Sequence, residues 1–259
     1  MLDASVAYSA IIGIFVGLSA GYLGSLMVLE KMALVGDALS HVALPGLALG
    51  ILFGFNPFIG AFAFLFGSAV LIWELGRVTK LSFEAIVGAL FTLALAVGII
   101  IIPEPELLEA LFGDITAVTF IDAIAAIAIS IVAVYLTRII YRKLILGMIS
   151  EDLAKSKGID IPRTNLLYLL LVSLIVAVGI RIVGTLLVGF LVIVPAASAK
   201  NVSTNLSKYF TLSAIFGLTS ALVGVLIAGY FSLSGGPIVV FVGITIFAVT
   251  ILLRSRMMR

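Results

Sequence analysis

The stretch from Phe83 to Ile102 reads FEAIVGALFTLALAVGIIII, and its one ionisable residue is Glu84. A transmembrane helix needs roughly 20 mainly apolar residues, because that length crosses about 30 Å of hydrocarbon. The apolar run here is continuous, whereas strands of a membrane barrel alternate apolar and polar residues over about ten positions. This stretch therefore predicts a helix that spans a lipid bilayer.

The same pattern extends over almost the whole chain. Of its 259 residues 63% are hydrophobic and 11% are charged, and the mean hydropathy is +1.36. A soluble domain is roughly half apolar, so water is not the main solvent of this protein. We predict an all-α integral membrane protein that forms one domain over residues 1–259. Charges, prolines and glycines divide it into about nine transmembrane helices, over residues 5–29, 33–53, 58–76, 83–102, 120–138, 165–181, 184–200, 210–231 and 237–253.

The division between the sixth and seventh of these helices is the weakest, since Arg181 and the three residues after it must form the whole turn. Basic residues near helix ends stay on the cytoplasmic side, so their positions predict the orientation. An external N-terminus and a cytoplasmic C-terminus leave only Arg181 outside. The basic residues then inside are Lys31, Arg77, Lys80, Arg138, Arg142, Lys143, Lys155, Lys157, Arg163, Lys200, Lys208, Arg254, Arg256 and Arg259.

The longest internal loop, about residues 144–164, predicts a short cytoplasmic helix. Ser150 is a good N-cap, and Glu151 and Asp152 suit the positive first turn of a helix. Lys155 suits its last turn, and Gly158 can adopt the left-handed conformation that ends it. We expect this helix to be about two turns long.

The residues best suited to bind a ligand lie in the second predicted span. Asp37 and His41 are four residues apart, hence on one face of a helix, and His41 is the only histidine of the chain. A carboxylate and an imidazole suit a borderline divalent cation such as Zn²⁺, Mn²⁺ or Fe²⁺. Pro45 and Gly46 then interrupt the helix, as happens near transport sites.

A purely structural interpretation of Asp37 and His41 is a hydrogen bond between them that joins two helices, with Pro45 as an ordinary kink. Two ligands fall short of the four to six that metal sites usually have. A second copy of the chain, water or another helix would have to supply the others. Of the other acids near span ends, Asp114 and Asp122 outside are expected in water, and Glu74 and Glu84 inside are expected in water or paired with the Arg77–Lys80 loop.

Motifs for catalysis are missing from the sequence. It has no Walker-type glycine-rich loop, nucleophile elbow or zinc-protease motif, and no cysteine. The chain is therefore not expected to be an enzyme or to carry a permanent cofactor. Energy for transport has to come from an ion gradient or from a partner.

Five segments in this order resemble the ABC-3 family, the membrane subunits of zinc, manganese and iron importers. They are residues 31–46 (KMALVGDALSHVALPG), 111–114 (LFGD), 151–159 (EDLAKSKGI), 183–188 (VGTLLV) with 194–199 (VPAASA), and 235–239 (GGPIV). The family often has Thr before its Gly-Pro, where this chain has Ser234-Gly235-Gly236-Pro237. A second histidine, which some zinc-transporting relatives have, is also missing.

The resemblance implies an ATP-driven importer of divalent metal ions in the cell membrane. It implies a homodimer with the pathway near the subunit interface, two cytoplasmic ATPase subunits that bind ATP, and an external metal-binding protein. Asp37 and His41 match the family's membrane Asp/His pair. The coupling helix that enters the ATPase would contain Ser150, Glu151, Asp152, Leu153, Ala154, Lys155 and Gly158.

Two other functions remain open at this point. A proton- or sodium-coupled carrier could use Asp37 and His41 as a proton relay. An intramembrane enzyme is less well supported, because no acid, base and nucleophile cluster within the spans. One carboxylate and one imidazole also select poorly among first-row metals, so the sequence does not identify the transported ion.

Overall fold

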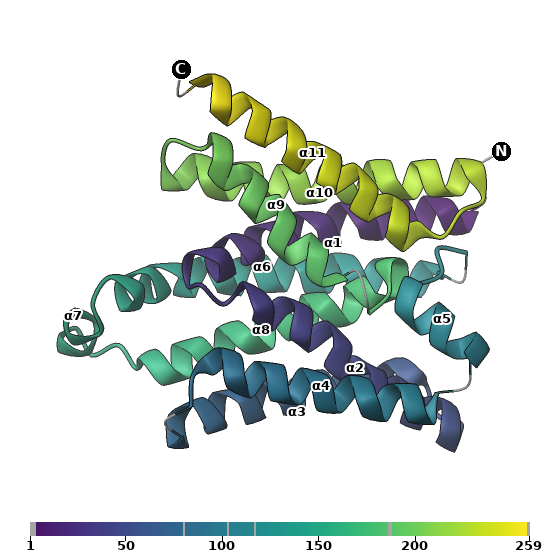
Figure 1. Cartoon of the computed structure of the whole chain (residues 1–259), viewed down its shortest axis with the longest axis horizontal. Coiled ribbons are helices and arrows are strands. Elements are labelled where there is room, and N and C mark those ends of the chain that lie inside the picture. Colours follow the sequence, from purple (N-terminus) through teal and green to yellow (C-terminus); the bar gives the residue numbers. More distant parts are fainter. Residues whose placement is uncertain (1–3, 80, 103, 117, 186–187, 258–259) are drawn as a thin grey trace.

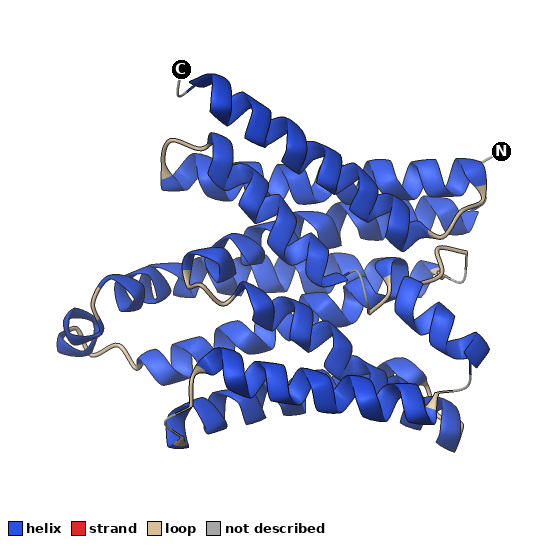
Figure 2. Ribbon diagram, viewed as in Figure 1, coloured by secondary structure: helices blue, strands red, loops and turns tan. Residues whose placement is uncertain are grey.

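A computed structural model describes residues 4–79, 81–102, 104–116, 118–185 and 188–257. All regular structure in these ranges is helical, which confirms the predicted fold class (Figures 1 and 2). The helices are α1 (Ala4–Leu29), α2 (Ala33–Phe53), α3 (Pro57–Val78), α4 (Phe83–Ile101), α5 (Glu104–Phe112), α6 (Phe120–Ile149), α7 (Glu151–Ser156), α8 (Ile161–Val183), α9 (Val188–Val202), α10 (Leu206–Phe231) and α11 (Gly235–Met257).

Eight of these helices are long and apolar enough to cross a bilayer, namely α1 to α4, α6, α8, α10 and α11. The span predicted over 184–200 corresponds to α9, which has 15 residues. At 1.5 Å per residue α9 is about 22 Å long, shorter than the hydrocarbon layer. The count of nine spans and the external N-terminus therefore stay predictions.

One additional helix and two helix ends differ from the sequence-based expectation. The loop after α4, predicted to be external, contains the short helix α5. Helix α6 has 30 residues and continues past the predicted end at 138 to Ile149, so the first part of the 144–164 segment prolongs a membrane helix. Arginine and lysine are good helix formers whose long stems reach the interface, so a basic run does not end a helix. Helix α8 likewise runs through Arg181 and ends at Gly184, whose φ is +77°.

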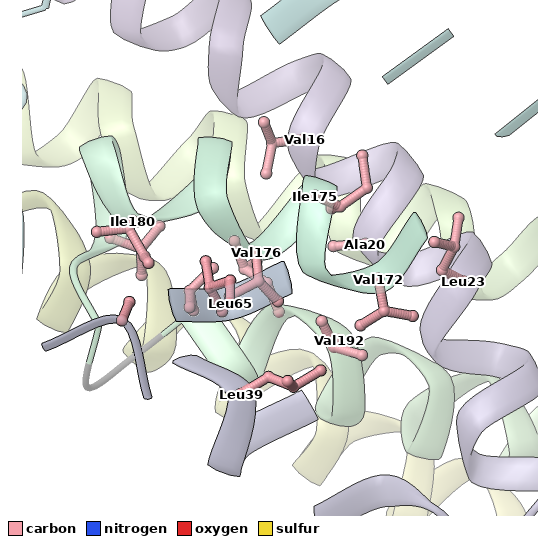
Figure 3. Packing of buried hydrophobic residues seen from close by; sticks show 14 of the residues in the cluster. Val16, Ala20, Leu23, Leu39, Leu65, Val172, Ile175, Val176, Ile180 and Val192 are labelled. Atoms are coloured by element: carbon pink, nitrogen blue, oxygen red, sulfur yellow. The ribbon is translucent and has the colours of Figure 1, made fainter. Parts of the chain in front are cut away.

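The centre of the bundle is α1, which packs against α6, α8, α9 and α10. A Cβ atom added to Gly17 would lie 2.5 Å from the Gly217 carbonyl oxygen of α10, so small residues allow this close approach. Figure 3 shows the core formed by α1, α2, α8 and α9, with Val16, Leu39, Ile175 and Val192 among its side chains.

Burial divides the helices into inner and outer ones. In the apolar stretch of α2 78% of residues are buried, against 22% in α4 and α11. Helix α2 packs against α4 and α9, and α9 packs against α11. Helices α4 and α11 lie on opposite sides of Figure 1 with α2 and α9 between them. We call the surface of α2 and α9 between α4 and α11 the central face.

Candidate metal pathway

The candidate pair lies on α2, which follows a sharp reversal of the chain. Lys31 has a left-handed φ of 61° between α1 and α2. Helix α2 then continues through Pro45 to Phe53. Because proline has no N–H, the carbonyl of His41, four residues earlier, lacks its usual helical hydrogen bond. Gly46 permits the crossing with α3, since an added Cβ would lie 2.2 Å from the Gly60 carbonyl oxygen.

His41 is buried inside the subunit. Its residue surface is 4% exposed, and its Nδ1 atom has no hydrogen-bond partner among the described residues. The ring meets Phe91 of α4 edge to face, with 4.9 Å between the ring centroids. A buried polar atom without a partner is costly, so an orphan imidazole nitrogen is suited to receive a cation or a proton.

Asp37 lies one turn earlier on α2 and is partly buried. It approaches α9 at Gly189, where an added Cβ would lie 2.6 Å from the Asp37 Cα and 2.7 Å from its Oδ1. No hydrogen bond joins Asp37 to His41 within the described part of the chain. The purely structural interpretation, in which the two side chains satisfy each other, is therefore not what this conformation contains.

The pair does not form a complete metal site by itself. Among the described residues no three His, Asp or Glu side chains lie close enough together to hold an ion. Asp37 and His41 thus supply one carboxylate and one imidazole at most. The contacts with Gly189 and Phe91 were not predicted, because nothing in the sequence pairs those positions with α2.

The end of the bundle opposite α7, where α6 begins and α8 ends, has an ion pair that the sequence did not indicate. Arg181 of α8 lies 3.2 Å from Asp122 of α6, with side chains 26% and 21% exposed. The guanidinium also lies 3.9 Å from the centroid of the Phe58 ring in α3. Asp122 caps α6 as well, because its carboxylate accepts a hydrogen bond from the Thr119 backbone N–H. Asp122 was expected in water, whereas it pairs with Arg181, and that arginine joins α6, α8 and α3.

Other acids fit the expectation better. Glu74 pairs with Arg77 at 3.4 Å, and both side chains are exposed. Asp114 accepts hydrogen bonds from Thr116. It lines a pocket of about 170 Å³ together with Glu106, Glu109 and Arg181.

The predicted short helix is confirmed as α7, and Figure 1 places it at one extreme end of the molecule. The Ser150 hydroxyl accepts a hydrogen bond from the Leu153 N–H at 3.2 Å. Gly158 follows α7 with a φ of +71°, which is the expected left-handed stop. Ala154 is buried, whereas Leu153 is 45% exposed. An exposed leucine on a protruding polar helix indicates a surface that a partner could cover.

Eight apolar helices long enough to cross a bilayer, with a buried imidazole nitrogen that has no hydrogen-bond partner among the described residues one turn from a carboxylate, are typical of membrane transport proteins. Comparison with known proteins specifies the class further. Residues 4–254 match the ABC 3 transport family, and the chain belongs to this family. It is a multi-pass membrane-spanning permease subunit of an ABC transporter.

Relatives and solved structures agree with this assignment. The chain is 31% identical to the manganese transport system membrane protein MntC of Listeria monocytogenes over 246 residues, which cover 93% of this chain and 88% of the relative. It is 31% identical to the high-affinity zinc uptake system membrane protein ZnuB of Buchnera aphidicola, with 92% and 94% covered. The structure of PsaBC from Streptococcus pneumoniae in complex with Fab has a TM-score of 0.84 at 30% identity, with 96% and 91% covered.

A second structure, an inward-facing conformation of a putative metal-chelate type ABC transporter, has a TM-score of 0.79 and covers 95% of this chain and 85% of that one. At 20% identity it supports the fold alone.

Proposed function

We propose that this chain is the permease of an ABC importer for divalent first-row metal ions, Mn²⁺ and Zn²⁺ foremost, and that Asp37 and His41 contact the ion on its way. Relatives named for manganese and zinc support the cargo. The observation that carries the site is the unpartnered Nδ1 of His41 one helical turn from the Asp37 carboxylate. Such a pair binds the ion weakly, which suits transport because a tight site would retain it.

A second copy of the chain would complete the pathway. The central face contains α2 and α9, and it is bordered by α4 and α11, the least buried spans. A copy related by two-fold symmetry would cover this face and bring a second Asp37–His41 pair to the same interface. We therefore propose a homodimer whose interface uses α4 and α11.

Engineered cysteines test this dimer directly, because the natural chain has none. Leu93→Cys in α4 and Phe241→Cys in α11 alter side chains that are 61% and 73% exposed. We expect oxidation to cross-link at least one of these variants in membranes. Tyr135→Cys in α6, 63% exposed, is the matched control and should stay monomeric on a denaturing gel. Cross-linking of the control alone would refute this interface.

The ATPase subunits would bind at α7. Leu153 presents an apolar side chain there, and Glu151 and Lys155 form an exposed ion pair at 3.2 Å beside it. ATP would bind and be hydrolysed on those subunits, and an external binding protein would deliver the metal on the opposite side.

The test of the pathway is uptake of radioactive Mn²⁺ and Zn²⁺ by cells that produce the permease with its ATPase and binding protein. We expect Asp37→Ala and His41→Ala to reduce uptake severely at equal membrane abundance. Ser40→Ala is the matched control on the same turn, since the Ser40 hydroxyl only donates to the Asp37 carbonyl. Full uptake by both site variants would remove the pair from the pathway. Uptake that persists without the ATPase and stops with a protonophore would favour the proton-coupled carrier instead.

A further inference from the structure

A groove of about 690 Å³ lies on a side of the bundle that the metal pathway does not use. Helices α6 and α10 both pack against α1 but share no extensive contact with each other among the described residues, so α1 forms the bottom of the groove. Its lining residues come from α1, α6 and α10, and none belongs to α2, α4, α9 or α11. The volume is typical of a site for an organic molecule.

Polar side chains gather at one level of this groove. Arg138 and Arg142 are one turn apart on α6, and Ser207 lies in the first turn of α10. Tyr22 of α1 stands at the same level, because its ring and that of Phe210 are 5.8 Å apart. A helix N-terminus and two guanidinium groups all attract negative charge.

Within the described part of the chain, these arginines have no counter-ion. None of the groove's lining residues is acidic, and the salt bridges of the described residues include neither Arg138 nor Arg142. A pair of cations on a membrane-exposed surface is stabilised by an anion that occupies the same place. The groove thus carries two positive charges that no acidic side chain of the described residues neutralises.

The rest of the groove is apolar. Farther along the three helices, on the side away from α7, its lining includes Leu18, Val134 and Leu218. A ligand that fits both parts has an anionic head and a hydrocarbon tail. Basic pockets between membrane helices are typical sites for the head groups of anionic lipids.

We propose that this groove binds an anionic phospholipid from the leaflet on the α7 side. Arg138 and Arg142 contact its phosphate through the planar, bidentate geometry that guanidinium groups favour. The acyl chains lie along Leu18 and Leu218. The site needs a membrane-spanning chain but no metal, so it stands or fails independently of the function proposed above.

Native mass spectrometry of the purified full-length chain tests the proposal, with phosphatidylglycerol as the probe and phosphatidylcholine as the zwitterionic comparison. We expect wild type to retain phosphatidylglycerol preferentially, and Arg138→Gln with Arg142→Gln to weaken its binding on the order of tenfold or more. The matched control is Lys143→Gln with Lys208→Gln, which removes the same charge from α6 and α10 at positions that do not line the groove. The control should bind like wild type.

A second variant fills the groove and keeps both arginines. Ala214→Phe places a ring among the apolar lining and should also weaken phosphatidylglycerol binding, whether or not the arginine variant folds. If the lysine control lost as much phosphatidylglycerol binding as the arginine variant, any basic residue near this end of the helices would suffice, and the proposed site would be refuted. Equal binding of soluble glycerophosphoglycerol would show a phosphate site without a lipid, and unchanged binding in the arginine and Ala214 variants would refute the proposal.

Discussion

Gly189 of α9 lies so close to Asp37 of α2 that a Cβ atom on Gly189 would be 2.7 Å from the Asp37 Oδ1. The absence of a side chain at Gly189 therefore sets the position of the carboxylate at the central face. The same added atom would lie 2.6 Å from the Asp37 Cα, so the backbone of one helix would have to move.

Gly189→Ala is accordingly expected to impair transport without removing any ligand. Overpacking of this kind costs about 1–3 kcal/mol, which corresponds to a loss of roughly fivefold to 150-fold if it falls on the transporting conformation. Metal uptake at equal membrane abundance measures the effect. Gly67→Ala in α3 is the control, since nothing lies within 4 Å of its added Cβ. If both variants transport like wild type, the close approach has no role in the pathway.

The pair of Arg181 and Asp122 should contribute to stability at the end of the bundle opposite α7. A partly buried ion pair and a cation–π contact contribute roughly 1 kcal/mol each. Arg181→Gln loses both contacts with Asp122 and Phe58, whereas Asp122→Asn weakens the pair and the cap of α6. We expect both variants to lower the melting temperature in detergent. Glu74→Gln, which breaks an exposed pair, should change it little. A smaller effect for Arg181→Gln than for Glu74→Gln would contradict this assignment.

Glu30, just after α1, should make stability depend on pH. Its Oε2 is buried and has no hydrogen-bond partner among the described residues, and burial raises the pKa of this carboxyl to about 7 from 4.5. The folded state then binds a proton more tightly than the unfolded state, so stability is highest below about pH 4.5 and falls as the pH rises to about 7. The loss is of the order of a few kcal/mol.

Glu30→Gln removes the titrating group and keeps the shape. We expect it to melt higher than wild type at pH 8 and to show a weaker pH dependence between pH 5 and 7. Glu84→Gln, at an exposed position, serves as the control and should keep the wild-type profile. Superimposable curves for wild type and Glu30→Gln would disprove the burial effect.

Hydropathy predicted most of the fold because a bilayer leaves the backbone few choices. Ser150 and Gly158 predicted α7 for an equally local reason, since caps act within one turn. The long end of α6 was missed, because its basic residues fit a helix that leaves the membrane as well as they fit a loop. The surroundings of the candidate site were not predictable. His41 meets Phe91, and Asp37 meets Gly189, through contacts between helices far apart in the sequence.

The backbone at Gly158 gives the sharpest test of coupling through α7. Its φ of +71° is left-handed, and an added Cβ would meet nothing within 4 Å, so a substitution there changes backbone strain and little else. Gly158→Ala costs about 1 kcal/mol in this conformation, whereas asparagine tolerates it better. We expect Gly158→Ala to reduce metal-stimulated ATPase activity of the reconstituted transporter several-fold and Gly158→Asn to retain more of it. Leu153→Asp should abolish stimulation with the bundle still folded, because it replaces an exposed apolar contact by a charge. Full stimulation in Leu153→Asp would place the ATPase contact elsewhere, and equal activity of both Gly158 variants with wild type would show that the stop of α7 does not influence coupling.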